Sequence, residues 1–426
     1  MKTEPVLVVG TTADYIDLIE RDFPGRALFL TDPAERERAE KYPDPGPDSE
    51  ILCPLNFTAA RNVLRRRKDR GEELAGIACF DCESLALTAE LAQDLSLPFV
   101  SPEAVRVARD KYRSKKLWER AELPGPAARL VREPEEAVEF IRGGRRPAVL
   151  KPLTGSGSEL VLLCREESDC RRGFVLLREK LSTHPNRRLY EPQDGIDPRA
   201  VFVIEEFIEG EEWSCDFTID PRRGTQLLRL TRKILAQDHS FGTVLAYRLS
   251  PEIPAGIDPE DFSHQLQQAA RALGIERSIC MLDFIVAEDS ARMIELTPRP
   301  GGDCLVALER LSGGFEMLGY ALDFASGIEP PPPPLKSYLP LAGLQLLAPR
   351  GGIISQIDPT LLLADPRVRE CRLTAQVGDR IMMPPDDYES RRLGHLIFEP
   401  RTGDLAAECR ELAGMLQLRF NTQYSI

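Results

Sequence analysis

The chain has 426 residues, of which 42% are hydrophobic and 29% are charged. A typical domain has roughly 150 residues, so this length predicts about three domains, and the composition excludes the disordered, collagen-like and coiled-coil classes. The 68 acidic side chains outnumber the 55 basic ones and give a formal net charge of -13. Because such a charge repels polyanions, we expect no nucleic acid and no anionic membrane as the main partner.

The sequence predicts no membrane span and no secretion signal. The longest apolar candidate, residues 337–349, has thirteen residues and is broken by Pro340 and Gly343, whereas a membrane span needs about 18 to 20. The first residues, MKTEPVLVVG, place an acid and a proline before a short apolar run, which is not the pattern of a signal peptide. We therefore expect a cytoplasmic location.

Cysteines and histidines predict neither disulfides nor a soft metal site. The ten cysteines are dilute in a chain of this length, and the four histidines have no metal-binding spacing. Any metal ion is therefore expected to be a hard cation with oxygen ligands.

Short apolar runs alternate with helical patterns in the first hundred residues. Residues 6–30 predict strand, helix and strand, and residues 77–100 repeat the pattern and end in a short strand at 98–100. This alternation predicts an open parallel sheet. Ser101-Pro102-Glu103 combines a capping hydroxyl, a proline and an acid, which predicts a helix start and a domain boundary nearby.

Residues 148–164 predict two strands joined by a glycine-containing loop, Thr154-Gly155-Ser156-Gly157-Ser158. The backbone N–H groups of such a loop can contact phosphate oxygens, and Lys151 on the first strand can reach the same anion. No G-K-[ST] follows, so this is not a Walker loop. From these residues alone, an ordinary surface hairpin is equally well supported.

The segment 201–220 predicts two strands around an acidic turn, with the sequence VFVIEEFIEGEEWS at its start. Backbone groups of residues 206–208 can pair with the edge of a purine, and the Glu212 carboxylate can accept both hydroxyls of a ribose. Taken alone, a solvated acidic turn is favoured.

A hairpin over residues 278–299 gives the sharpest local prediction. Pairing its strands symmetrically about Asp289 puts Asp283 opposite Glu295. The opposite face then collects the apolar side chains of Leu282, Phe284, Val286, Ile294 and Leu296.

Two carboxylates about 5 Å apart repel each other unless they share a proton or hold a cation. With only oxygen ligands available and the Thr297 hydroxyl nearby, Mg²⁺ or Mn²⁺ is favoured. The alternative is that the two acids share a proton or point apart.

Several cations lie near these acids in the sequence. Arg299 is held between two prolines, and its planar guanidinium suits a phosphate or carboxylate. The strand 226–235 carries Arg229, Arg232 and Lys233, one of which can meet a terminal phosphate. Five prolines, residues 330–334, predict a stiff extended segment and the last domain boundary.

Taken in order, these pieces resemble the ATP-grasp superfamily of carboxylate–amine ligases. The string EEFIEGEEWS is similar to the hinge of phosphoribosylamine–glycine ligases, and Asp283, Glu295 and Arg299 are similar to the metal and catalytic stretch of biotin carboxylases and L-amino-acid ligases. The resemblance assigns nucleotide binding to two phosphate-holding lysines, a flexible phosphate loop, an adenine hinge and a ribose-binding acid: Lys111 and Lys151; Gly155, Ser156, Gly157 and Ser158; Glu205, Glu206, Phe207 and Ile208; and Glu212.

The resemblance implies an α/β and α+β protein with the ATP-grasp fold. It places a Rossmann-like pre-ATP-grasp domain over residues 1–108 and an ATP-grasp domain over 109–330, with two lobes and a hinge near 205–210. A small α+β domain follows over 336–426.

The implied activity is ATP-dependent ligation of a carboxylate to an amine through an acyl phosphate, with release of ADP and phosphate. An amino acid or small carboxylic acid is the expected substrate, and ATP with one or two Mg²⁺ (or Mn²⁺) ions is the expected cofactor set. Arg299 and either Lys233 or Arg232 are the expected catalytic cations, assisted by the backbone N–H groups of Gly301 and Gly302. A homodimer is also expected, because dimers are common in similar proteins.

One departure from the family pattern concerns the metal. The family usually has E-x-N-x-R, whereas this chain has E-L-T-P-R, which puts Thr297 in place of an asparagine ligand. Asp283, Glu295 and Thr297 are the expected ligands, and one or two ions both remain open. A small-molecule kinase and a non-catalytic ATP-binding regulator are the alternative functions; a biotin-dependent reaction is weaker, because no biotin carrier segment is visible.

Overall fold

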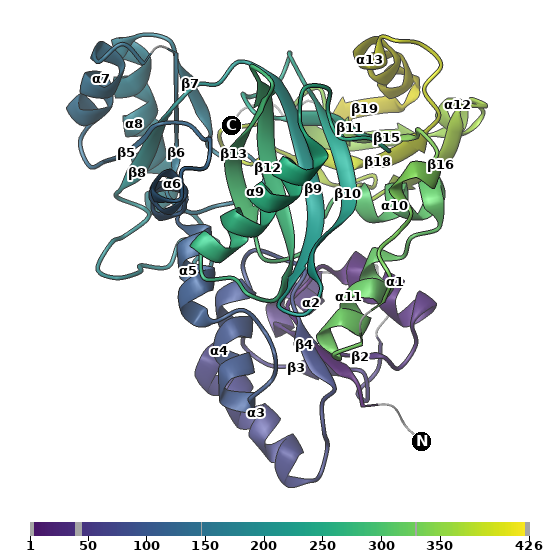
Figure 1. Ribbon diagram of the computed structural model, residues 1–426. Helices are drawn as coiled ribbons and strands as arrows, with labels where there is room; N and C mark the ends of the chain where they lie inside the picture. Colours follow the sequence, from purple (N-terminus) through teal and green to yellow (C-terminus); the bar gives the residue numbers. More distant parts are fainter. Residues whose placement is uncertain (1–3, 39–44, 146, 329, 422–426) are drawn as a thin grey trace.

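The computed structural model describes residues 4–38, 45–145, 147–328 and 330–421 (Figure 1). The predicted ends of the first and last domains, residues 1–3 and 422–426, lie outside the described residues. None of the described helices is long and apolar enough to cross a membrane.

The N-terminal part is a four-stranded parallel sheet in the order β3-β2-β1-β4, as the alternating pattern predicts. Its elements are β1 (Val6–Val9), α1 (Ala13–Asp22), β2 (Ala27–Thr31), α2 (Pro33–Arg38), β3 (Glu50–Leu52), α3 (Phe57–Asp69), β4 (Gly76–Ala78) and α4 (Leu85–Leu95). The short strand expected at 98–100 is wrong. Val100 is buried, but it packs against the core beside the large sheet rather than pairing with β4.

Two helices connect this sheet to the rest of the chain, α5 (Pro102–Arg109) and α6 (Lys111–Arg120). The Ser101 hydroxyl accepts from the backbone N–H of Ala104, so the predicted cap of α5 is confirmed. The Asp110 carboxylate caps α6 by accepting from the N–H groups of Tyr112 and Arg113. This cap fixes where α6 begins, and thereby which of its side chains face the strands.

A small antiparallel sheet follows, in the order β5-β8-β6-β7. It contains β5 (Ala128–Val131), β6 (Ala148–Pro152), β7 (Leu162–Cys164) and β8 (Phe202–Glu206), and it is covered by α7 (Pro134–Arg142) and α8 (Glu167–Ser182). We call this sheet with its two helices the small lobe. It lies at the upper left in Figure 1.

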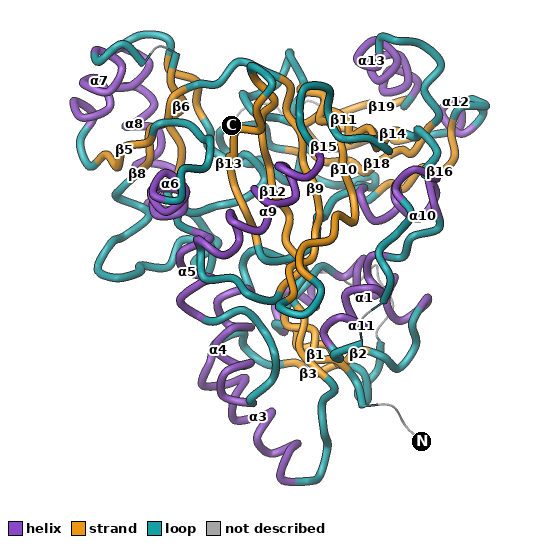
Figure 2. Tube along the Cα trace, viewed as in Figure 1, coloured by secondary structure: helices purple, strands orange, loops and turns teal. Residues whose placement is uncertain are grey.

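The centre of the molecule is an eight-stranded antiparallel sheet in the order β13-β12-β9-β10-β11-β14-β18-β16 (Figure 2). Its strands are β9 (Glu211–Asp220), β10 (Gly224–Leu235), β11 (Val244–Leu249), β12 (Ser278–Ala287), β13 (Ser290–Thr297), β14 (Ala342–Leu347), β16 (Val368–Leu373) and β18 (Arg392–Phe398). The associated helices are α9 (Pro259–Ala272), α10 (Leu305–Gly313) and α11 (Met317–Ala325).

The last part of the chain is continuous with this central sheet. After the prolines and a single turn at Leu335–Ser337, β14 pairs directly with β11. A further sheet of β15 (Gly352–Asp358), β17 (Arg380–Ile381) and β19 (Gln417–Asn421) completes this α+β part, together with α12 (Thr360–Leu363) and α13 (Leu405–Met415). The division into three domains stays a prediction, and the strand pairing crosses its last boundary.

The register of the β12–β13 hairpin confirms that Asp283 lies opposite Glu295. The turn itself differs from the prediction, because it has two residues, Glu288 and Asp289, both with positive φ (50° and 57°). A two-residue turn alone would pair Asp283 with Ile294. A β-bulge between the Phe284–Met293 and Asp283–Glu295 pairs restores the acid pair.

The bulge also corrects the predicted core face. Met293 is fully buried and packs with Phe284 and Leu296, whereas Ile294 was expected there and instead faces the opposite side of the sheet, where it lines the main cavity. The extra residue switches the alternation of side chains, so that Met293 takes the core position and Ile294 does not.

A buried ion pair underlies the segment that follows β13. The Arg229 guanidinium is fully buried on β10, and its Nε donates to Asp216 on β9 at 2.9 Å. The same Asp216 carboxylate accepts from the backbone N–H of Gly301 at 3.1 and 3.2 Å. Arg229 is therefore a structural cation that anchors the chain after the hairpin, and it does not face a phosphate as the sequence allowed.

Replacing Arg229 with methionine should destabilise the protein by about 3–5 kcal/mol, because it leaves the Asp216 carboxylate buried without its cation. Urea unfolding followed by circular dichroism measures this loss. The matched control is Arg232→Met on the same strand, whose partner Glu211 is exposed, with an expected cost below about 1 kcal/mol. Equal costs for the two variants would contradict the structural role of Arg229.

Candidate active site

All of the sequence-predicted site residues except Arg232 line one cavity of about 540 Å³. The cavity lies between the small lobe, the large sheet, the ends of the N-terminal strands and the C-terminal strands. Its predicted lining residues are Lys111, Lys151, Gly155, Ser156, Gly157, Ser158, Glu205, Glu206, Phe207, Ile208, Glu212, Lys233, Asp283, Glu295, Thr297 and Arg299. Elements far apart in the sequence therefore meet at one site.

Arg232 is the exception, and its predicted role as a catalytic cation is wrong. It lies outside this cavity lining, and its guanidinium pairs with the exposed Glu211 at 2.7 Å. Adjacent residues of a strand point to opposite faces, so Lys233 faces the cavity and Arg232 faces solvent. Of the two alternatives, Lys233 is the one placed to act there.

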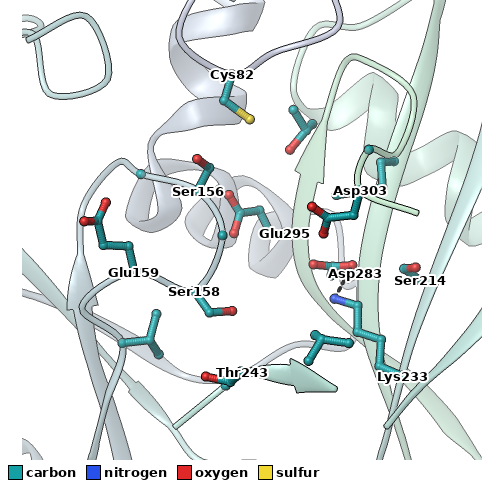
Figure 3. Close-up of a pocket in the computed structure, with 18 of the residues that line it drawn as sticks. Cys82, Ser156, Ser158, Glu159, Ser214, Lys233, Thr243, Asp283, Glu295 and Asp303 are labelled. Atoms are coloured by element: carbon teal, nitrogen blue, oxygen red, sulfur yellow. Dashed lines mark ion pairs between the residues drawn. The ribbon is translucent and has the colours of Figure 1, made fainter. Parts of the chain in front are cut away.

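Each carboxylate of the opposed pair is held by a lysine. The Lys233 ammonium lies 2.7 Å from an oxygen of Asp283 (dashed in Figure 3), and Lys111 donates to Glu295 at 3.1 Å. Burial favours the neutral form of Glu295, but Lys111 and Lys151 outweigh it, so the pKa of Glu295 lies below its usual value. Glu295 is therefore kept as a carboxylate.

The chemistry of this pair fits a hard divalent cation. Asp283 and Glu295 both line the cavity, and both are labelled in Figure 3. Thr297 also lines the cavity, two residue pairs further along the hairpin. No group of three or more His, Cys, Asp or Glu side chains suited to a metal occurs within the described ranges. Two carboxylates with water and phosphate oxygens completing the shell is the usual mode for Mg²⁺.

A second carboxylate, Glu205, lies between two buried lysines. Lys151 contacts one oxygen at 2.6 Å and Lys115 contacts the other at 2.8 Å. Lys115 was missed by the sequence analysis, although it lies one helical turn after Lys111 and therefore on the same face of α6. It also donates to the carbonyl of Ile294 at 2.7 Å, so α6 holds the bulge that opposes the acids.

Burial lowers the pKa of Lys115 to about 8, although the neighbouring Glu205 favours the charged form. Glu212, the expected ribose-binding acid, also lines the cavity, and burial raises its pKa while Lys233 acts in the opposite direction.

The phosphate loop spans the gap between β6 and β7, residues 153–161. The returning strand begins at Leu162, later than the predicted Glu159, because Glu159 instead contacts His184 and Tyr190. Gly157 has φ 64°, and a side chain there would meet Arg392 of the C-terminal part. That contact would be an ordinary van der Waals one, so it is the left-handed backbone conformation that favours glycine here.

The expected adenine hinge crosses from the small lobe to the large sheet, since β8 and β9 belong to different sheets. The N–H groups of Glu206 and Phe207 donate to the carbonyls of Ala127 and Pro147. These two donors are therefore used within the protein, which leaves Ile208 as the expected donor to a purine edge.

Arg299 is half-buried in the cavity, and two of its guanidinium nitrogens lie 3.1 and 3.2 Å from the Cys82 sulfur. The Gly301 N–H was expected to face an oxyanion, and this is wrong because it binds the Asp216 carboxylate. Gly302 does line the cavity, so it is the remaining backbone candidate.

Gln345 and Arg392 of the C-terminal part contribute to one wall of the cavity, and no sequence motif indicated this. Asp303 accepts hydrogen bonds from Tyr247 (3.2 Å), Gln345 (3.0 Å) and Arg392 (2.7 Å), all of which line the cavity. Tyr388 lies in the loop that precedes β18, and its side chain is buried in the core of the small lobe. This loop therefore ties the C-terminal strands to the lobe that carries the phosphate loop.

Comparison with known proteins agrees with this arrangement. Residues 145–307 match the model of the ATP-grasp domain. Carnosine synthase 1 from Homo sapiens is 26% identical over 283 residues, which are 64% of this chain and 33% of that protein. The chain spans about a third of the length of the carnosine synthases that it matches.

Solved structures with low sequence identity share the fold. The L-amino acid ligase from Bacillus licheniformis superposes with a TM-score of 0.75 and 16% identity, covering 99% of this chain and all of that one (100%). The phosphoribosylglycinamide synthetase from Anaerococcus prevotii has a TM-score of 0.64 and 17% identity, covering 98% and 100%.

The parallel N-terminal sheet, the small lobe, the large antiparallel sheet and the cavity between them define the ATP-grasp fold. The chain therefore contains an ATP-grasp domain, which the family model matches over residues 145–307.

Replacing Lys115 with methionine should weaken ATP binding about tenfold at about pH 7, because Glu205 and the bulge lose a charge-assisted hydrogen bond. Near pH 9.5 the difference in ATP affinity between the variant and the wild type should become smaller. The pKa of Lys115 is about 8, so the wild-type lysine is neutral at that pH. Calorimetric titration with ATP and Mg²⁺ measures both affinities.

The matched control for this variant is Lys116→Met, because Lys116 lies next to Lys115 but pairs with the exposed Glu119. It should leave the affinity unchanged at both pH values. If Lys115→Met weakens ATP binding by the same factor at both pH values, the charge of the Lys115 ammonium has no role in nucleotide binding.

Proposed function

We propose that this protein is an ATP-dependent carboxylate–amine ligase that forms an amide or peptide bond through an acyl phosphate. The observation that carries the proposal is the meeting, in one cavity, of the opposed carboxylates Asp283 and Glu295 with three lysines and Arg299. Such a site can neutralise a triphosphate tail and a carboxylate together, which is what activation of a carboxylate by ATP requires.

The nucleotide end of the cavity is assigned to the hinge and its surroundings. Ile208 would meet the purine edge, Glu212 the ribose hydroxyls, and Lys151 the phosphates. Lys151 is 5% exposed and is oriented by its contact with Glu205, so its ammonium group is fixed before the nucleotide binds. Fixed charges stabilise a developing charge without reorganisation at the moment of reaction.

Asp283 and Glu295 would hold Mg²⁺, with Thr297 as a weaker additional ligand. Mg²⁺ supplies charge neutralisation at the phosphate oxygens when it is bound. Lys111 and Lys233 now contact these two carboxylates, and we assign their ammonium groups to the phosphate oxygens of the bound nucleotide. Lys111 also donates to the carbonyl of Gly155 at 3.1 Å, which ties it to the phosphate loop.

In the proposed reaction, a substrate carboxylate oxygen attacks the γ-phosphorus and the bond to ADP breaks, with its electron pair leaving on ADP. The amine then attacks the acyl carbon, phosphate departs with the C–O electron pair, and the nitrogen loses a proton. Arg299 would bind the oxygen that becomes negative in the second step. The phosphate loop and the C-terminal loop around Tyr388 would keep water from the acyl phosphate.

The substrate class is proposed to be an amino acid. Two similar proteins are named carnosine synthase and L-amino acid ligase, and the cavity contains both carboxylates and guanidinium groups that suit a zwitterion. A homodimer is also proposed, since one structural neighbour is described as a biotin carboxylase domain dimer.

The direct test incubates the protein with ATP, Mg²⁺ and pairs of proteinogenic amino acids, and measures released phosphate and product masses. We expect ADP, phosphate and a product that has lost one water relative to the two substrates. A stable phosphorylated product would instead identify a kinase, and nucleotide binding without ADP release would identify a regulator.

Replacing Glu295 with glutamine should lower ADP formation at least about 100-fold, because one of the two proposed metal ligands loses its charge. Chelation of divalent cations should have a similar effect on the wild type. The matched control is Glu211→Gln, since Glu211 lies outside this cavity and pairs with Arg232. Normal turnover by the Glu295 variant would contradict the assignment.

A further inference from the structure

A second cavity of about 340 Å³ adjoins the first one. It is formed by α1, by α10 and the chain between α10 and α11, and by β16 and β18, elements that lie on the right of the molecule in Figure 1. Asp14, Tyr15, Asp303 and His395 line both cavities. These four residues therefore form a shared wall between the proposed reaction site and the second cavity.

The second cavity carries a surplus of negative charge. Three of its acids are neutralised by arginines: Asp22 by Arg21, Glu370 by Arg310, and Asp303 by Arg392. Its other three acids, Asp14, Asp17 and Glu316, form no hydrogen bond or ion pair through their side chains with any other described residue. Arg21 acts electrostatically on Asp17, and Arg310 and Arg21 act on Glu316, which leaves Asp14 as the carboxylate best placed to attract a cation.

One arginine of this cavity also has a side chain without a hydrogen-bonded or ion-paired partner among the described residues. Arg372 on β16 lines the second cavity but not the first, and its side chain makes no hydrogen bond or ion pair within the described part of the chain. In the register of β16 and β18, Arg372 lies opposite His395 of the shared wall. The cavity therefore presents a cation close to the wall that also carries Asp14.

An independent observation points to a ligand at the shared wall. Tyr15 is 8% exposed, and its hydroxyl has no hydrogen-bond partner among the described residues. Burial raises the pKa of Tyr15 well above its usual range, so the group stays a hydroxyl. An unpaired buried hydroxyl costs about 1–3 kcal/mol, and a polar ligand group at the wall would remove that cost.

We propose that the second cavity binds the amine substrate, and that this substrate is an amino acid with a free carboxylate. The inference rests on the ligase function proposed above. The reacting nitrogen must reach the first cavity, so the ammonium end belongs at the shared wall, where Asp14 binds it and the Tyr15 hydroxyl contacts the substrate. The carboxylate end then belongs at Arg372.

The test compares two nucleophiles on the same acyl phosphate. Hydroxylamine is small and uncharged near pH 7 and traps acyl phosphates as hydroxamates without needing a dedicated pocket, whereas a proteinogenic amino acid must occupy the proposed site. Hydroxamate formation by the wild type, with ATP and Mg²⁺, first establishes the ligase chemistry. If the wild type forms no hydroxamate with any proteinogenic amino acid as the carboxylate, the ligase proposal itself fails.

In Asp14→Asn, we expect the ratio of amino-acid ligation to hydroxamate formation to fall at least tenfold, through a raised KM for the amino-acid nucleophile. In Arg372→Met, we expect a similar rise in KM for the amino acid, but little change for the corresponding amino-acid amide, which lacks the carboxylate. Hydroxamate formation by each variant shows that it is folded and activates its carboxylate.

The control variant is Glu20→Gln, because Glu20 lies on the same helix but lines neither cavity, and its carboxylate accepts from the Ser49 hydroxyl. It should keep the wild-type KM. The proposal is overturned if the wild type forms hydroxamates and joins amino acids while both variants keep the wild-type KM. It is also overturned if the wild type has the same KM for an amino-acid amide as for the corresponding amino acid.

Discussion

The opposition of Asp283 and Glu295 on neighbouring strands is the constraint on which the rest of the site depends. Two carboxylates at this spacing repel each other in a covered cavity, and the protein compensates with a lysine on each of them, Lys233 from β10 and Lys111 from α6. The pair therefore brings the large sheet and α6 to the same point. A site that concentrates both charges in this way is prepared for a ligand that carries many negative oxygens and a divalent cation.

A β-bulge keeps Asp283 opposite Glu295. The two-residue turn would offset the strands by one position, and the bulge at Ile294 removes that offset. The Ile294 carbonyl is bound by Lys115, which also contacts Glu205 on β8 of the small lobe. One buried lysine thus links the bulge, the small lobe and α6, and the geometry of the acids depends on the packing of three elements.

The parts that the sequence could predict are those in which alternation of side chains sets the geometry. The facing of Asp283 and Glu295 follows from the apolar residues around them, and the parallel N-terminal sheet follows from the alternating strands and helices. The bulge could not be predicted, because Met293 and Ile294 are both apolar and alternation does not tell which of them enters the core.

Contacts between segments that are far apart in the sequence also could not be predicted from local sequence patterns. Arg229 and Lys233 lie on one strand, yet one is fully buried against Asp216 and the other faces the cavity, and only the surrounding sheet and helices decide this. The wall around Asp303 and Arg392 joins segments about 90 residues apart without any motif.

The central claim is that Asp283 and Glu295 bind a hard divalent cation beside the triphosphate. The most direct measurement is a crystal structure of the protein with Mn²⁺ and a non-hydrolysable ATP analogue, with anomalous scattering recorded for manganese. The account predicts an anomalous peak in contact with both carboxylates and with phosphate oxygens, and Lys111 and Lys233 turned to the phosphates. Manganese elsewhere, with both carboxylates still paired to their lysines, would contradict it.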